Sequence, residues 1–101
     1  MTLETLTLED GERGELVLCP EHDVADPLVT LDGSDDFAVE DVLLGNLPAP
    51  SVEVSDTRRG TWSARIRGIL AGPESHLKVL VRNTGGGRIT LRATIAEEND
   101  E

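Results

Sequence analysis

The sequence predicts an all-β protein, a compact antiparallel β-sandwich of jelly-roll or immunoglobulin-like type with seven or eight short strands. Three observations predict this fold class: aliphatic and β-branched residues recur in short runs, several runs alternate between apolar and polar side chains, and clusters of Gly, Pro, Asn and Asp separate them. At 101 residues the chain is long enough for one hydrophobic core. We therefore expect a single domain over residues 1–96, followed by an acidic solvated tail over 97–101.

The C-terminal part carries the clearest strand pattern. Every second side chain between residues 61 and 67 is apolar, which is the period of a strand with one solvated face. Alternation also predicts strands over 77–82, where Leu77, Val79 and Val81 alternate with Lys78, Leu80 and Arg82, and over 88–95. The segment 83–87 between these two strands is rich in glycine, which favours a short loop with positive φ, so the sequence predicts a β-hairpin.

The N-terminal half is less regular. Short apolar runs separated by turn-forming residues predict four further strands, over residues 3–8, 16–19, 28–31 and 51–54. The apolar residues of segment 37–44 fit neither a period of two nor a helical period throughout, so this segment is expected to be a strand or one or two helical turns. The proline-containing segment 46–50 is expected to be a stiff connector.

The chain is strongly acidic, and its charges are unevenly distributed. The formal net charge is −11; residues 1–57 hold fifteen acids and one base, whereas residues 58–96 hold eight bases and one acid. Binding to phosphate groups depends on clustered Lys and Arg, and Phe37 and Trp62 are the only Phe, Tyr or Trp residues available to stack on bases. We therefore predict no nucleic acid and no membrane among the partners. An acidic composition with little lysine also suggests a halophilic source.

The bases of the C-terminal half suggest a docking surface. If the three C-terminal strands share one sheet, alternation places their basic side chains on one face, namely Arg65, Arg67, Lys78, Arg82, Arg88 and Arg92. Such a face would bind an acidic surface, either on another copy of the chain or on a larger assembly. The alternative is that the acidic and basic halves neutralise each other within one molecule, with the arginines merely solvated.

No residue cluster predicts catalysis or a cofactor. Cys19 and His22 are close in sequence, but nucleophilic catalysis also needs a group that orients the base, and His76 lies in a separate segment. A zinc site usually needs four ligands, mostly Cys and His, which one cysteine and two histidines do not supply. We therefore predict that the protein is not an enzyme and that Cys19 is a small buried hydrophobic residue at a strand end.

An acidic turn is a candidate calcium site. Calcium takes oxygen ligands, and the turn and the segment after it carry several, of which the candidates are Asp32, Asp35, Asp36 and Glu40. The spacing does not match the twelve-residue calcium loop. The interpretation as a solvated turn is therefore preferred, and no metal is predicted.

The sequence also bears on localisation. The N-terminus does not have the basic and apolar regions of a signal peptide, no apolar run approaches the roughly 20 residues that span a bilayer, and a single cysteine cannot form an internal disulfide. These features predict a cytoplasmic protein, or one in a virus particle assembled in the cytoplasm, and not one secreted by a signal peptide.

These observations favour a non-enzymatic structural or assembly protein. The format, a small acidic β-domain without a catalytic set, is similar to that of accessory components of virus particles, such as head decoration or tail proteins. The expected partner is a protein, either other copies of the chain as an oligomer or a larger assembly such as a capsid. The alternatives are an acidic binding module or inhibitor that mimics a polyanion, and a calcium-dependent ligand-binding β-domain.

Overall fold

The alternating segments of the sequence form strands. In the computed structural model, which describes residues 2–45, 47–49, 51–56 and 60–96, eleven strands and no helix are present. The strands are β1 (Thr2–Leu8), β2 (Arg13–Leu18), β3 (Val24–Ala25), β4 (Leu28–Gly33), β5 (Phe37–Leu44), β6 (Leu47–Pro48), β7 (Val52–Asp56), β8 (Thr61–Ile66), β9 (Leu70–Ala71), β10 (Leu77–Asn83) and β11 (Ile89–Ala96). No helix that could cross a membrane occurs in this described part of the chain.

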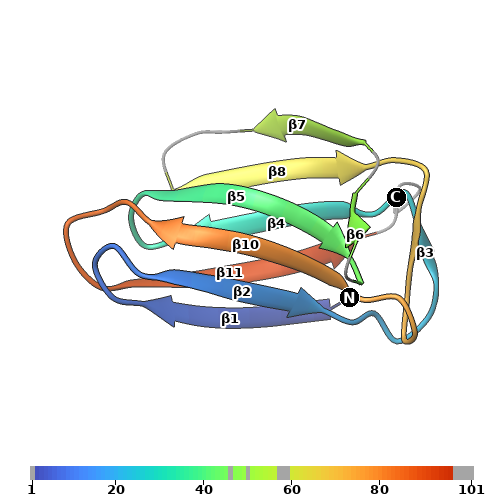
Figure 1. Cartoon of the computed structure of the whole chain (residues 1–101), viewed down its shortest axis with the longest axis horizontal. Helices are drawn as coiled ribbons and strands as arrows, with labels where there is room; N and C mark the ends of the chain where they lie inside the picture. The colour runs from blue at the N-terminus through green and yellow to red at the C-terminus, as the bar shows by residue number, and fades with distance from the viewer. Residues whose placement is uncertain (1, 46, 50, 57–59, 97–101) are drawn as a thin grey trace.

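The strands form three antiparallel sheets. Sheet A has the order β1-β11-β4-β8-β7, sheet B has the order β2-β10-β5-β6, and β3 pairs with β9 in a small third sheet. Figure 1 shows sheet B in front of sheet A, with β3 and β9 at one end of both. The sequence predicted only two sheets. The third was missed because β3 and β9 are two residues long, and strands this short leave no periodic pattern.

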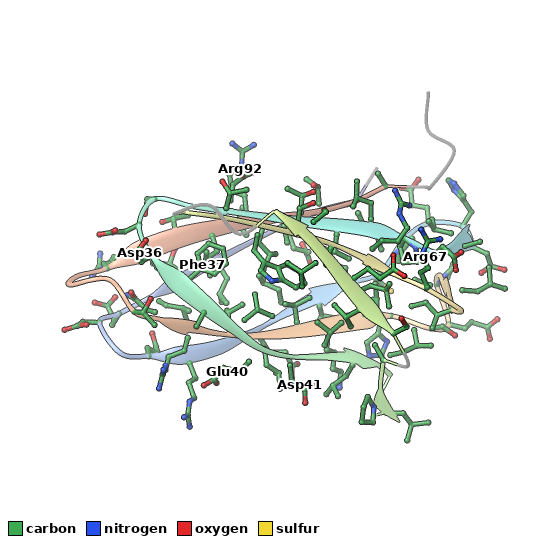
Figure 2. All side chains as sticks on the ribbon, turned by 90° about the horizontal axis from the view of Figure 1, so that it is seen from above. Asp36, Phe37, Glu40, Asp41, Arg67 and Arg92 are labelled. Carbon is green, nitrogen blue, oxygen red and sulfur yellow. The ribbon has the colours of Figure 1, made fainter. Side chains whose placement is uncertain are left out.

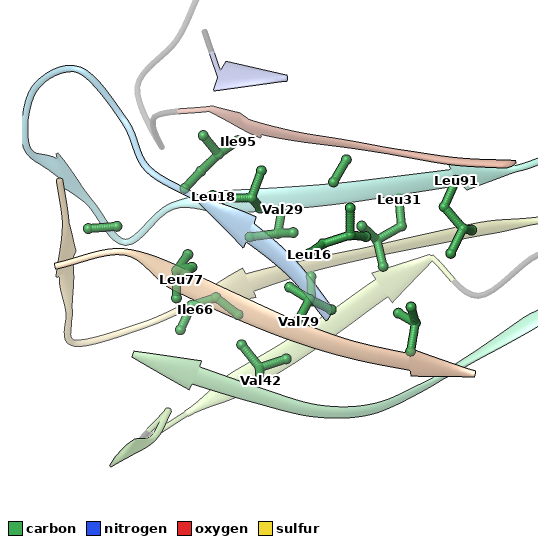
Figure 3. Close-up of a cluster of buried hydrophobic side chains, with 14 of the residues drawn as sticks. Leu16, Leu18, Val29, Leu31, Val42, Ile66, Leu77, Val79, Leu91 and Ile95 are labelled. Carbon is green, nitrogen blue, oxygen red and sulfur yellow. The ribbon is translucent and has the colours of Figure 1, made fainter. Parts of the chain in front are cut away.

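The hydrophobic core lies between sheets A and B. Alternate residues of each sheet point inward, so that Leu31 and Ile66 from sheet A meet Leu18 and Leu77 from sheet B, all fully buried (Figure 3). Burying each of these side chains contributes about 1.5–3 kcal/mol. Trp62 is half-buried and packs against the same cluster, as the alternation of its strand predicts.

Strand β2 passes unusually close to β1 at Gly14. A Cβ atom at this position would lie 2.6 Å from Cδ2 of Leu8 and 2.7 Å from Cδ2 of Leu6. An added Cβ would force both leucine side chains to shift, so glycine lets the side chains of β1 pack directly against the backbone of β2.

A β-bulge explains the irregular pattern of segment 37–44. The segment is a single strand, β5, but its register with β10 shifts so that Leu80 pairs with Asp41 and Val81 pairs with Val39. The extra residue, Glu40, separates two inward-facing stretches that are out of phase by one position. The sequence therefore shows no single period, although the whole segment is extended.

The predicted hairpin between residues 77–82 and 88–95 is wrong. Strand β10 pairs with β2 and β5 in sheet B, whereas β11 pairs with β1 and β4 in sheet A. The connecting loop therefore arches from one sheet to the other across the roughly 10 Å that separates stacked sheets. Gly85, Gly86 and Gly87 do not have the positive φ that the hairpin interpretation expected, and the local pattern does not distinguish an arch from a hairpin.

The remaining sequence predictions fall partly outside the described residues. The expected connector over 46–50 contains β6, and positions 46 and 50 are not among the described residues. The expected acidic tail over 97–101 also lies outside them.

Candidate docking face

The outer face of sheet A is rich in hydroxyl groups. Its outward positions on strands β1, β11, β4 and β8 are mostly threonine and serine, namely Thr5, Thr7, Thr30, Thr61, Ser63, Thr90 and Thr94. The hydroxyls of Thr30 and Ser63 lie 3.2 Å apart across two strands. Arg92 lies in register with Asp32 on this face, which places opposite charges side by side. Sheet A therefore presents a polar surface of the kind that water solvates well.

The outer face of sheet B has a different chemistry, with Leu80 at its centre. Leu80 is half-buried and points outward, because its neighbours Val79 and Val81 on β10 are fully buried. Across the sheet it is in register with Glu15 on β2 and Asp41 on β5. A leucine on a solvated strand face is an exception to the apolar–polar alternation of this strand.

Four charges surround Leu80 in the form of a cross. Two bases, Lys78 and Arg82, precede and follow it on its own strand at the same outward phase, and the two acids Glu15 and Asp41 flank it on the neighbouring strands. We call Leu80 and these four residues the charged cross.

A row of half-buried aliphatic residues lies next to the charged cross. Val17 and Leu43 are in register with Lys78 on either side, and the exposed Pro48 of the edge strand β6 continues the row. The adjacent Leu47 is 73% exposed, the highest value among the large hydrophobic side chains of the described residues. Sheet B thus combines aliphatic side chains with balanced charges on one face.

The bulge at Glu40 completes this face. The carboxylate of Glu40 lies 3.1 Å from Nε of Arg13 and 3.9 Å from Nε of Arg82. Both arginine side chains are well exposed, so each pair contributes no more than about 1 kcal/mol to folding. With these residues included, the outer face of sheet B carries three bases and three acids, although the whole chain has a net charge of −11.

The structure corrects the prediction of a single basic face. Arg65 and Arg92 belong to the outer face of sheet A, whereas Lys78 and Arg82 belong to that of sheet B, because β10 is not in the same sheet as β8 and β11. Figure 2 shows Arg92 above the upper layer, on the opposite side of the molecule from Glu40 and Asp41 of β5.

The other two predicted arginines lie at opposite ends of the sheets. Arg67 follows β8 and its Nε donates to Oε1 of Glu53 over 2.9 Å. Arg88 precedes β11 at the other end, and its Nε donates to Oε2 of Glu9 over 2.8 Å. Each arginine is thus paired with an acid of the N-terminal half, as the alternative of internal neutralisation predicts for these two residues.

Many of the acids of residues 1–57 are found in the loops at the two ends of the sheets. At the end with the β10–β11 loop are Glu9, Asp10, Glu12, Asp35 and Asp36; at the end with β3 and β9 are Glu21, Asp23 and Asp26. This arrangement does not provide the single row of acids on one face that mimicry of a polyanion requires.

The four candidate calcium ligands are not brought together. Asp32 lies on sheet A, where it accepts a hydrogen bond from Thr61 over 3.3 Å, and Glu40 lies on sheet B beside Arg13. Asp35 caps the turn by accepting from the backbone N–H of Asp36 over 2.8 Å. No cluster of three His, Cys, Asp or Glu side chains that could hold a metal ion occurs in the described ranges.

The prediction that Cys19 is buried is wrong. The residue follows β2 and is exposed, with Sγ 3.8 Å from the carbonyl oxygen of Pro73. The inward phase of the strand ends one residue earlier, at the fully buried Leu18, so alternation itself places the next side chain outward. Cys19 does not form a metal cluster with His22 or His76 in this part of the structure.

Comparisons with known proteins return no relative from which function can be transferred. The chain matches no protein-family model, and no curated protein and no solved structure matches it significantly. The chemistry of its own surfaces therefore carries the functional argument.

Proposed function

We propose that this chain is a non-enzymatic structural or assembly domain that docks onto another protein through the outer face of sheet B. One observation carries the proposal. Most outward positions of sheet A hold Thr, Ser or a charged residue, and Leu28 is a single half-buried leucine among them, whereas those of sheet B hold the aliphatic residues Val17, Leu43 and Leu80 between balanced charges.

The cost of leaving this face solvated supports the proposal. Aliphatic surface gains about 25 cal/mol for each Å² removed from water, and Val17, Leu43 and Leu80 share one face, where a single partner could cover them together. Sheet B also balances its own charges, so a partner meets little long-range repulsion from this face despite the net charge of the chain.

We propose further that the fold is a jelly roll rather than an immunoglobulin-like sandwich. Numbered by the eight longer strands alone, sheet A contains the first, eighth, third and sixth strands side by side, and sheet B the second, seventh and fourth. A jelly roll places its fifth strand beside the fourth. Here the short β6 occupies that position, and the chain then crosses to pair as β7 with β8. An immunoglobulin-like sandwich pairs the first two strands in one sheet, whereas β1 and β2 lie in different sheets.

An accessory role in a larger particle is consistent with this architecture. Jelly rolls are frequent in viral capsid domains, and the small acidic format is similar to that of decoration and tail components. Since fold does not determine function, the docking face is the part of the proposal that an experiment must test.

Site-specific photo-crosslinking in the cells that make the protein tests the docking face. A photoreactive p-benzoylphenylalanine is placed at Leu80, and in a matched control at Thr30, which is also half-buried and outward-facing but on sheet A. The expected result is a discrete protein adduct from position 80 and none from position 30. Equal adducts from both positions, or none from position 80 in a folded chain, would contradict the proposal.

A further inference from the structure

We propose that the protein docked on sheet B is a second copy of this chain, in a two-fold dimer whose strands cross at nearly a right angle with Leu80 on the axis. This inference rests on the proposed docking function and names its partner. In such a dimer the same face is used by both copies, so every contact occurs twice.

Two copies of the charged cross are complementary in charge only when one is rotated by about a right angle relative to the other. Its bases, Lys78 and Arg82, lie along the strand from Leu80, and its acids, Glu15 and Asp41, lie across the strands. When a second copy is placed face to face with its strands crossing at about 90°, each basic arm covers an acidic arm of the other copy. All four arms then meet an opposite charge.

Aligned strands give the opposite result. A two-fold axis along β10 would set Lys78 on Lys78 and Arg82 on Arg82, and an axis across the strands would set Glu15 on Glu15 and Asp41 on Asp41. Like charges facing each other across an interface are strongly unfavourable. The charge pattern therefore disfavours aligned packing and favours orthogonal packing, which is one of the two arrangements that stacked sheets adopt.

The lengths of the arms permit this match. Neighbouring strands lie about 4.8 Å apart, and residues two apart on one strand lie about 6.6 Å apart. A basic arm is thus about 2 Å longer than the acidic arm that it covers, a difference that flexible Lys, Arg and Glu side chains absorb. Leu80 lies on the two-fold axis and contacts Leu80 of the other copy. The axis can run along either diagonal between the arms of the charged cross. Along one diagonal Val17 also contacts its own copy, and along the other Leu43 does.

The distribution of the remaining acids also favours crossed copies. Many of the acids occupy the loops at the two ends of the sheets. In an aligned dimer these loops would lie directly over one another, whereas in a crossed dimer the ends of each copy extend past the sides of the other. The sheets face along the shortest of the molecular dimensions, 37 × 27 × 22 Å (Figure 1), so their faces are broad enough for the roughly 800 Å² per partner that stable interfaces bury.

The first test measures the molar mass of the full-length chain by light scattering over a range of concentrations. The wild type is expected to shift from monomer to dimer as its concentration rises. Leu80→Glu is expected to remain a monomer, because it buries two carboxylates against each other on the axis. The matched control Thr30→Glu on sheet A is expected to dimerise as the wild type does.

A charge exchange tests whether the four arms of the charged cross lie in the interface. The variant Lys78→Glu/Arg82→Glu has four acidic arms, and Glu15→Lys/Asp41→Lys has four basic arms, so neither should form a homodimer. An equimolar mixture of the two should form a heterodimer, since every acidic arm of one copy then covers a basic arm of the other. Far-UV circular dichroism confirms that each variant is folded.

Crosslinking of a single thiol provides a readout that does not depend on charge variants. In the background Cys19→Ser, the variant Leu80→Cys places two thiols at the axis, and a short bismaleimide that spans the roughly 10 Å between stacked sheets should give a covalent dimer. Thr30→Cys in the same background should not. This measurement still decides the question if a charge variant fails to fold.

Three results would overturn the second-copy proposal: a wild type that stays monomeric at all concentrations, a Leu80→Glu variant that still dimerises, or folded charge variants that do not combine. If one of these is found while position 80 crosslinks to a different protein in cells, the docking function stands and only the partner is wrong. If position 80 also gives no adduct, the proposed function itself fails.

Discussion

The side-chain amide of Asn83 donates to the backbone carbonyl of Gly87 over 2.6 Å and so spans the loop that carries the chain from sheet B to sheet A. The same Nδ2 atom lies 2.9 Å from the carbonyl of Glu9 and 3.2 Å from that of Leu8. The side-chain oxygen accepts from the backbone N–H of Gly85 over 2.9 Å. Asn83 is the one buried polar residue of the described chain, and it joins the β10–β11 arch to the β1–β2 turn.

We predict that Asn83→Ala destabilises the fold by about 2–4 kcal/mol, because several buried backbone groups lose their partner at once. Urea unfolding followed by circular dichroism measures the change. Asn83→Asp should be comparably harmful, since a carboxylate cannot donate to these carbonyls. The exposed neighbour Thr84→Ala serves as control and should change the free energy of unfolding by less than about 0.5 kcal/mol. A stable Asn83→Ala would show that the arch is held by other contacts.

We predict that Gly14→Ala destabilises the protein by about 1–3 kcal/mol, because the added methyl group overlaps with Leu6 and Leu8. Gly86→Ala is the matched control, since a Cβ at that position has no atom within 4 Å. Thermal unfolding of the two variants should therefore differ clearly. Equal melting temperatures would indicate that β1 and β2 separate easily.

We predict a large contrast between two leucines on the same strand. Leu77 is fully buried, so Leu77→Ala should cost about 2–5 kcal/mol of folding free energy. Leu80 points outward, so Leu80→Thr should cost less than about 1 kcal/mol in the monomer. Urea unfolding at concentrations below those of any self-association measures both. A large loss for Leu80→Thr under these conditions would mean that its side chain stabilises the fold and not an interface.

We predict that the thiol of Cys19 reacts with a thiol reagent in the native protein without denaturant, because the residue is exposed. The rate should be within roughly tenfold of that measured in urea, as expected for an accessible thiol. A matched variant, Cys19→Ser with Leu18→Cys, places the thiol at a buried position and should react only on unfolding. Slow reaction of wild-type Cys19 would restore the interpretation as a core residue.

Part of the docking face could be recognised in the sequence. Leu80 interrupts the polar side of an alternating strand, and Lys78 and Arg82 follow from the same pattern. Glu15 and Asp41 could not be assigned to this face, because their strands are 65 and 39 residues away from Leu80 in the chain and nothing local specifies their register. The contribution of Glu40 depends on a bulge, which disturbs the sequence pattern without revealing its own position.

The sequence by itself determined that the chain is built of strands, where most of the longer strands lie, and which side of each strand is apolar. All of these follow from a period of two, which acts between neighbours along the chain. The tertiary structure alone decided which strands share a sheet, and therefore that the six predicted bases are divided between two faces and two ends. Strand pairing depends on hydrogen bonds between segments that are distant in the chain. The β10–β11 arch also depends on the buried side-chain amide of Asn83. The local pattern of residues 77–95 contains neither, so it was compatible with both a hairpin and an arch.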